Sequence, residues 1–137
     1  MDYEGIARTS YARVKDAAAF QAWAASFGCE TVKVVTRDQQ VEGAPVRLYG
    51  VVFGEGVPIA RYDAETGEDH EVDVLVDLQG HLADGWVWKV VETGHEGARF
   101  LIGVAHVVTP DTIQGMNLDQ WMSDSLPAGY ESTEPNY

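Results

Sequence analysis

Apolar residues recur at helical spacing in one segment near the start of the chain. Across residues 17–27, four of them fall on a single face: Phe20, Trp23, Ala24 and Phe27. This spacing predicts an amphipathic helix whose aromatic face packs into the core. Asp16 is the expected N-cap, and Gly28 is well placed to end the helix.

Strands are expected where polarity alternates or where β-branched residues are frequent. Segments of this kind are residues 10–15, 31–36 and 46–53, with residues 59–62 as a candidate for a further short strand. Residues 37–45 are polar and contain Gly43 and Pro45, so a turn or loop is expected there.

The clearest pair of strands lies in the second half of the chain. Residues 86–91 and 98–108 are two apolar runs, and the connection between them, residues 92–97, is short and contains two glycines. This pattern is typical of a β-hairpin, so antiparallel pairing is expected.

Two further segments favour helices. Residues 71–78 alternate well enough for a strand, yet Leu75, Leu78 and Leu82 also fit one helix face with Asp73 as N-cap. We favour a helix over residues 73–82 and leave the strand open. Residues 118–126 are expected to form one or two helical turns, with Asn117 as cap. The residues expected to face inward there are Leu118, Trp121 and Met122.

The order of these elements predicts the fold class. We expect an α+β protein whose antiparallel sheet of about five strands has two helices packed on one face, in the order β-α-β-β-α-β-β. A single domain is expected over residues 1–126, followed by a flexible C-terminal tail over residues 127–137, which holds glycine and two prolines.

The charge of the chain narrows the possible partners. Its 137 residues include 22 Asp and Glu against 9 Lys and Arg, a formal net charge of −13. Such a field opposes direct binding to nucleic acid or to an anionic membrane and attracts a basic partner. The plainer alternative is that acidity serves solubility. Cys29 is the single cysteine, and neither a secretory signal nor a membrane-length apolar run is evident, so a cytoplasmic location is expected.

Candidate catalytic and metal-binding motifs are weak. The four histidines, at positions 70, 81, 95 and 106, lack the short spacings of metal ligands, so no metal is expected. No serine lies in a nucleophile elbow, and no glycine-rich phosphate loop or cofactor fingerprint is present. We therefore expect no cofactor, no catalytic residue and no enzymatic activity.

The most distinctive feature is a run of acids without Lys or Arg between Tyr62 and Trp88. The candidate partner-binding residues in it are Asp63, Glu65, Glu68, Asp69, Glu71, Asp73, Asp77 and Asp84. In a helix, Asp69, Asp73 and Asp77 would share one face; in a strand, Glu71, Asp73 and Asp77 would do so. A row of this kind could occupy a groove meant for phosphates. Neutralising Asp69, Asp73 and Asp77 together should leave folding intact. The alternative is an ordinary solvated face.

A resemblance sharpens the functional expectation. Residues 11–16 with 20–23, and residues 81–85 with 90–105, together resemble small acidic α+β proteins of phages, conjugative plasmids and integrated mobile elements. Some proteins of that size and charge from such elements are anti-CRISPR or antirestriction inhibitors. The motifs of this resemblance bear on the fold, and together with the acid run it favours a stoichiometric inhibitor that binds a basic surface of a host nucleic-acid-processing complex. An immunity or antitoxin-like protein that caps a basic toxin is the alternative, and a small metal-binding protein or enzyme is a weaker one.

Overall fold

The computed structural model describes residues 3–97 and 100–135, and these residues form an antiparallel sheet, a separate hairpin and helices. The sheet has six strands in the order β2-β3-β1-β6-β7-β8. Their bounds are β1 (Glu4–Thr9), β2 (Val32–Val41), β3 (Ala44–Phe53), β6 (Trp88–Glu96), β7 (Phe100–Val108) and β8 (Ile113–Asn117). The separate hairpin pairs β4 (Ala60–Asp63) with β5 (Glu68–Glu71), and the helices are α1 (Ala17–Ala25), α2 (Val74–His81) and α3 (Leu118–Ser125).

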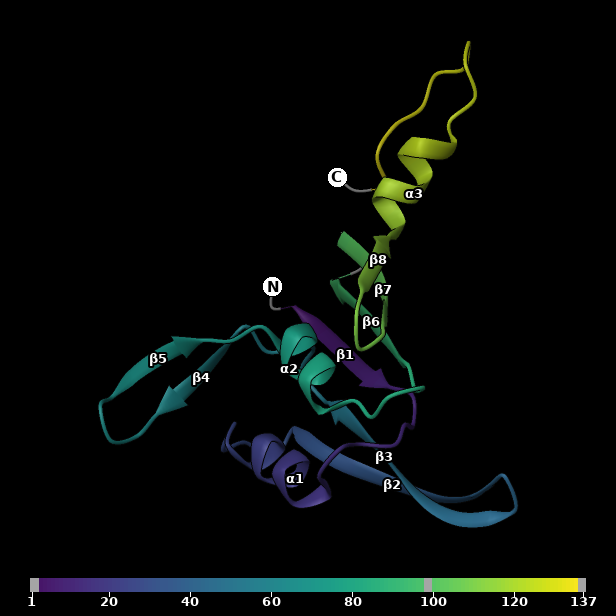
Figure 1. Cartoon of the computed structure of the whole chain (residues 1–137). Coiled ribbons are helices and arrows are strands. Elements are labelled where there is room, and N and C mark those ends of the chain that lie inside the picture. The colour runs from purple at the N-terminus through teal and green to yellow at the C-terminus, as the bar shows by residue number, and fades with distance from the viewer. Residues whose placement is uncertain (1–2, 98–99, 136–137) are drawn as a thin grey trace.

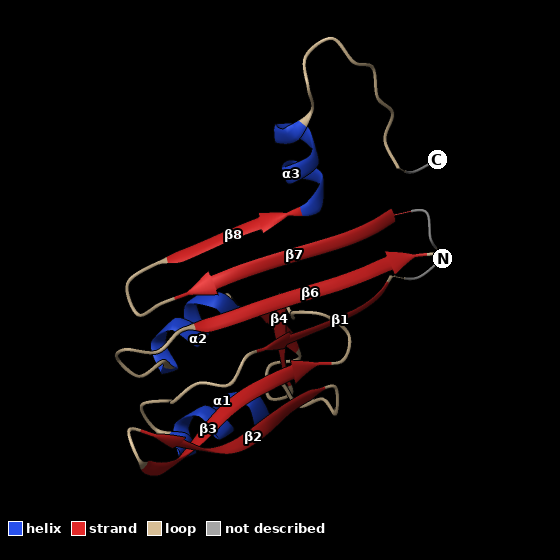
Figure 2. Cartoon of the chain, turned by 90° about the vertical axis from the view of Figure 1, so that its right-hand side faces the viewer, coloured by secondary structure: helices blue, strands red, loops and turns tan. Residues whose placement is uncertain are grey.

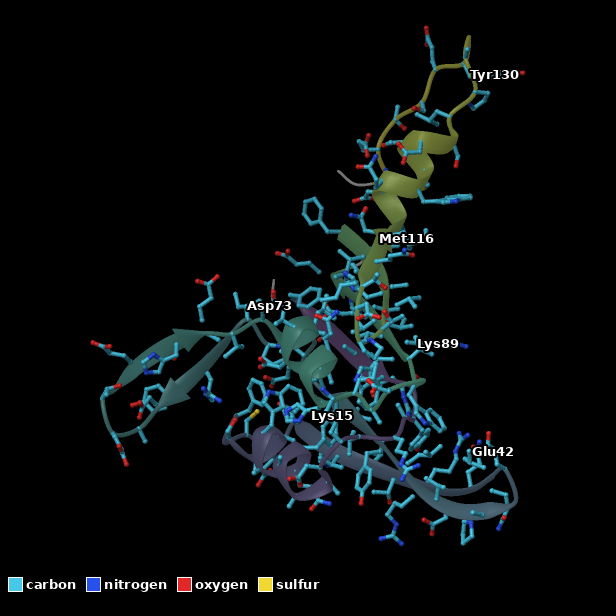
Figure 3. All side chains as sticks on the ribbon, in the orientation of Figure 1. Lys15, Glu42, Asp73, Lys89, Met116 and Tyr130 are labelled. Carbon is cyan, nitrogen blue, oxygen red and sulfur yellow. The ribbon has the colours of Figure 1, made fainter. Side chains whose placement is uncertain are left out.

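Helices α1 and α2 cover one face of the sheet and leave the other face open. Figure 2 shows the sheet with α1 and α2 behind its strands and α3 extending beyond β8. Strand β6 shows the two-residue period that this arrangement requires, because Trp88 and Val90 are buried while Lys89 and Val91 are exposed. Lys89 accordingly extends away from α2 in Figure 3.

The core lies between the sheet and these two helices, and aromatic rings dominate it. The rings of Phe20 and Trp88, both fully buried, stack with their centroids 5.8 Å apart. The Trp88 indole nitrogen, Nε1, donates a hydrogen bond to the carbonyl oxygen of Leu78 at 2.8 Å. Trp88 therefore joins the sheet to both helices, and its one polar atom is satisfied inside the core.

The α+β class and several individual elements are confirmed. The Asp16 side chain accepts a hydrogen bond from the Ala19 amide and caps α1, which Gly28 follows with a φ of 65°. Asp73 caps α2, so the helix is right and the strand alternative is wrong. The predicted hairpin exists as β6 and β7, in register from Trp88↔Val108 to Glu96↔Phe100. Pairing continues through residues 92–96, where a loop was expected, and residues 98 and 99 lie outside the described part.

The predicted number and order of strands were wrong in detail. The first strand is β1, whereas residues 10–15 contribute only isolated bridges, Ala12↔Tyr49 and Val14↔Leu82. Their alternation has another cause, since Ala12 and Val14 are buried as the chain crosses from β1 to α1. The acidic β5 and the fully exposed β8 were not expected, because neither has the apolar alternation that marks a half-buried strand.

Residues 37–45 are mostly strand, not loop. Strands β2 and β3 continue to Val41 and Ala44, and a two-residue turn joins them. In that turn Glu42 and Gly43 have φ values of 52° and 82°, the left-handed region that tight hairpin turns require. The strand ends are polar because they extend beyond the core and are exposed.

Helix α3 differs from the prediction in its packing. It forms where expected, and Asn117 accepts a hydrogen bond from the Gln120 amide as its N-cap. However, Leu118, Trp121 and Met122 are exposed, because the helix lies beyond the edge of the sheet (Figure 1). Described residues 127–135 lie in no helix or strand. None of the described helices is long and apolar enough to cross a membrane.

Candidate functional site

Five of the eight candidate acids lie together on one projecting element. We call residues 60–71, which comprise β4, β5 and their turn, the acidic hairpin; its five acids are Asp63, Glu65, Glu68, Asp69 and Glu71. The register pairs Asp63 with Glu68 and Tyr62 with Asp69. All four residues of β5 are exposed. The five carboxylates therefore line a narrow two-stranded arm.

Local hydrogen bonds shape the turn of the acidic hairpin. An Asp63 carboxylate oxygen accepts a hydrogen bond from the Glu65 amide at 2.9 Å, and Thr66 Oγ1 accepts one from the Glu68 amide at 3.3 Å. Gly67 has a φ of 72°, which a residue with a side chain adopts only with strain. The turn is therefore encoded by residues 63–68 themselves, which explains how a hairpin forms without a buried face.

Few contacts hold the acidic hairpin to the rest of the chain. The Val72 amide donates to the Ile59 carbonyl at 3.0 Å and closes the base of the hairpin itself, whereas Arg61 Nη1 reaches Ser26 Oγ, at the end of α1, at 3.0 Å. Figure 1 shows β4 and β5 extending away from the sheet. Ile59, which directly precedes the hairpin, and Tyr62 within it are 80% and 61% exposed, so apolar surface lies beside the charges.

The acidic hairpin is less uniformly anionic than its sequence suggested. Arg61 precedes the acid run but pairs across the strands with His70. His70 Nε2 lies 3.3 Å from Asp63 Oδ2. The pKa of Asp63 is lowered from its ordinary value, first by the hydrogen bond from the Glu65 amide and then by His70. One face of the hairpin thus has mixed charge, while Asp69 and Glu71 share the other face with Tyr62.

Asp73 and Asp77 serve the fold. Asp73, at the base of the hairpin in Figure 3, accepts a hydrogen bond from the Val76 amide at 3.2 Å as the N-cap of α2. Asp77 Oδ2 accepts one from Trp23 Nε1 at 2.9 Å. The proposed helical row of Asp69, Asp73 and Asp77 was wrong, because Asp69 belongs to β5 and α2 starts at Val74. Neutralising these three together should therefore destabilise the fold, contrary to the expectation from sequence. Asp84 is exposed and lies beyond the far end of α2.

The histidines lie in separate places. His81 packs against Phe20 and Trp23, each with a ring-centroid distance of 5.5 Å, and burial lowers its pKa. His95 lies 3.5 Å from Glu4, and His106 is half-buried in β7. Among the residues the structure describes, no group of three or more His, Cys, Asp or Glu side chains could hold a metal ion.

Sequence reasoning missed a second charged surface. Arg8, Arg37 and Lys89 come from β1, β2 and β6 and line one pocket on the open face of the sheet. Their separation along the chain leaves no motif, and only the strand order brings them together. The one sequence signal for this surface is the alternation of residues along β6, which places Lys89 on the face opposite the core. No protein-family model, curated protein or solved structure matches the chain, so no relative assigns a function to either charged surface.

Proposed function

We propose that this chain is a non-catalytic binding protein that presents the acidic hairpin to a basic surface of another protein. The observation that supports this is the concentration of five carboxylates on an arm with few contacts to the sheet and helices. An arm of this shape can enter a groove that a flat acidic surface could not reach. Basic grooves of that kind are typical of proteins that bind nucleic acid.

The proposed activity is stoichiometric inhibition of a nucleic-acid-processing complex. The carboxylates would occupy the positions of phosphates, and long-range attraction by a net charge of −13 would speed the encounter. Exposed Ile59 and Tyr62 would supply the apolar contacts that slow dissociation. Capping of a basic toxin would use the same surface, so the identity of the partner separates the two activities.

The test is capture of partners from the source organism's lysate with three forms of the chain. The first is the parent; the second carries Glu65→Gln, Glu68→Gln, Asp69→Asn and Glu71→Gln. The third is a matched control with the same loss of charge at exposed positions outside the helices and strands: Glu30→Gln, Glu55→Gln, Asp111→Asn and Glu131→Gln.

A basic partner should be retained by the parent and by the control but lost by the hairpin variant. Its binding should weaken steeply as salt rises through about 0.1 M, where charges are screened over about 10 Å. If both variants retain the partner equally, the acidic hairpin is only a solvated arm and the proposal fails. Circular dichroism of the three forms checks that each is folded.

A further inference from the structure

A pocket of about 610 Å³ opens on the face of the sheet that α1 and α2 leave uncovered. Three cationic side chains line it, Arg8, Arg37 and Lys89, together with the aromatic rings of Tyr11 and Trp86. No carboxylate is among its lining residues. In a chain with 22 acids and 9 basic residues, this concentration of positive charge is the reverse of the overall composition.

Tyr11 holds the two arginines close together. The Cζ atom of Arg37 lies 4.4 Å from the centroid of the Tyr11 ring, and that of Arg8 lies 5.6 Å from it. A guanidinium held over a ring keeps its in-plane N–H groups available, and these are the groups that bind phosphate oxygens in pairs. Within residues 3–97 and 100–135, the hydrogen bond of the Arg8 guanidinium is that from Nε to the Thr9 carbonyl at 3.2 Å.

None of the three cations has a carboxylate partner among the described residues. Arg47 provides the contrast, because its Nε lies 3.0 Å from Asp38 on the same β2–β3 hairpin. Three like charges in one pocket repel one another, and an anion bound among them would relieve that repulsion. Their charge and their free donors therefore favour an anionic ligand.

Size and aromatic character narrow the ligand class. Pockets that bind small molecules typically span about 300–1,000 Å³, and this pocket lies within that range. Trp86 adds aromatic surface on which a planar ring can stack, whereas the Tyr11 ring is already covered by the two guanidinium groups. A long polyanion would also meet the field of the remaining carboxylates, whereas a small ligand interacts mainly with the pocket itself.

We propose that Arg8, Arg37 and Lys89, with Tyr11 and Trp86, form a binding site for a mononucleotide. The phosphate binds to the donors of Lys89 and of the two arginines, which Tyr11 positions, and the base stacks on Trp86. This site lies on the opposite face of the sheet from α1 and α2 and does not depend on the function of the acidic hairpin.

The test is calorimetric titration of the whole chain at low salt with the 5′-monophosphates of adenosine, guanosine, cytidine and uridine. At least one should bind saturably, and its unphosphorylated nucleoside should bind about tenfold more weakly or not at all. In a proton–nitrogen NMR spectrum, the indole signal of Trp86 should shift along the same titration. Failure of all four nucleotides to bind would overturn the proposal.

Variants connect the binding to these residues. Arg8→Gln with Arg37→Gln should weaken binding by at least about tenfold, because both phosphate-facing guanidinium groups are lost. Arg47→Gln with Arg61→Gln removes the same charge outside the pocket and should leave binding unchanged. Equal weakening by both pairs would mean that general charge attracts the ligand, and the site would be rejected.

A ten-nucleotide single strand is the last ligand in the test. It carries the same chemical groups as a free nucleotide, but its further phosphates would meet the acidic surroundings. It should therefore bind no more tightly than the best mononucleotide. Binding tighter by more than about tenfold would replace the free nucleotide with a nucleic acid strand as the occupant and would contradict the proposal.

Discussion

The indole Nε1 of Trp23 donates a hydrogen bond to Asp77 Oδ2 at 2.9 Å and so joins α1 to α2, 54 residues apart in sequence. Both side chains are partly buried, and hydrogen bonds to charged groups contribute about 1.5–3 kcal/mol. Asp77→Ala should therefore lower the free energy of unfolding by about 1–3 kcal/mol. Urea denaturation measures this change.

Two controls test the origin of that loss. Asp69→Ala removes an exposed carboxylate from β5 and should change stability by less than about 0.5 kcal/mol. Trp23→Phe removes the donor of the same bond, so adding Asp77→Ala to it should cost less than Asp77→Ala costs alone. If the two losses simply add, the hydrogen bond does not stabilise the fold.

The elements predicted well from sequence are those whose signals are local. Helices α1 and α2 each start after an aspartate that caps them, and each presents apolar residues at helical spacing. The β6–β7 pair was recognisable because two apolar runs flank a short connection with two glycines. Strands β5 and β8 gave no such signal, since hydrogen bonding to one neighbour holds them and neither buries a face.

The candidate site shows the same limit. Asp69, Asp73 and Asp77 are evenly spaced in sequence, yet Asp69 lies in β5, Asp73 is the N-cap before α2, and Asp77 lies within α2. Their spacing along the chain therefore did not determine their spacing in the fold. Conversely, Arg8, Arg37 and Lys89 are distant in sequence. They meet because the sheet places their strands in the order β2-β3-β1-β6.

His81 should make stability depend on pH. Its packing against Phe20 and Trp23 lowers its pKa in the folded state, mainly through burial, so the unfolded chain binds the proton more readily. The stability that neutral His81 contributes is complete above about pH 6.5 and is lost as pH falls through the lower folded-state pKa.

The measurement is the urea midpoint of the parent and of His81→Gln between about pH 7.5 and 5, a range that spans the ordinary histidine pKa. The parent should lose more stability than the variant over this range. His70→Gln, at an exposed position on the acidic hairpin, controls for the removal of a histidine. If the urea midpoints of the parent and of His81→Gln change with pH by the same amount, protonation of His81 is not coupled to folding.

Glu42 occupies a backbone conformation that its side chain disfavours. Its φ of 52° lies in the left-handed region, where asparagine and glycine are accepted more readily, and Gly43 follows at 82°. Glu42→Asn should raise the free energy of unfolding by about 0.5–1 kcal/mol. Glu42→Gln removes the same charge without the preference for that conformation. Equal gains for both variants would attribute the effect to charge.

Helix α3 should contribute little to the stability of the sheet. None of its residues is buried, and its Leu118 side chain lies beside β7 at Gly103. Trp121→Ala should therefore change the free energy of unfolding by less than about 1 kcal/mol, whereas Phe20→Ala in the core should cost about 3–5 kcal/mol. Isolated helices this short are marginal in water, so the amides of α3 should exchange with solvent far faster than those of β6. Strong protection in α3, or a loss at Trp121 close to that at Phe20, would show that its apolar side is covered in solution, and the helix would then have to be treated as part of a packed interface.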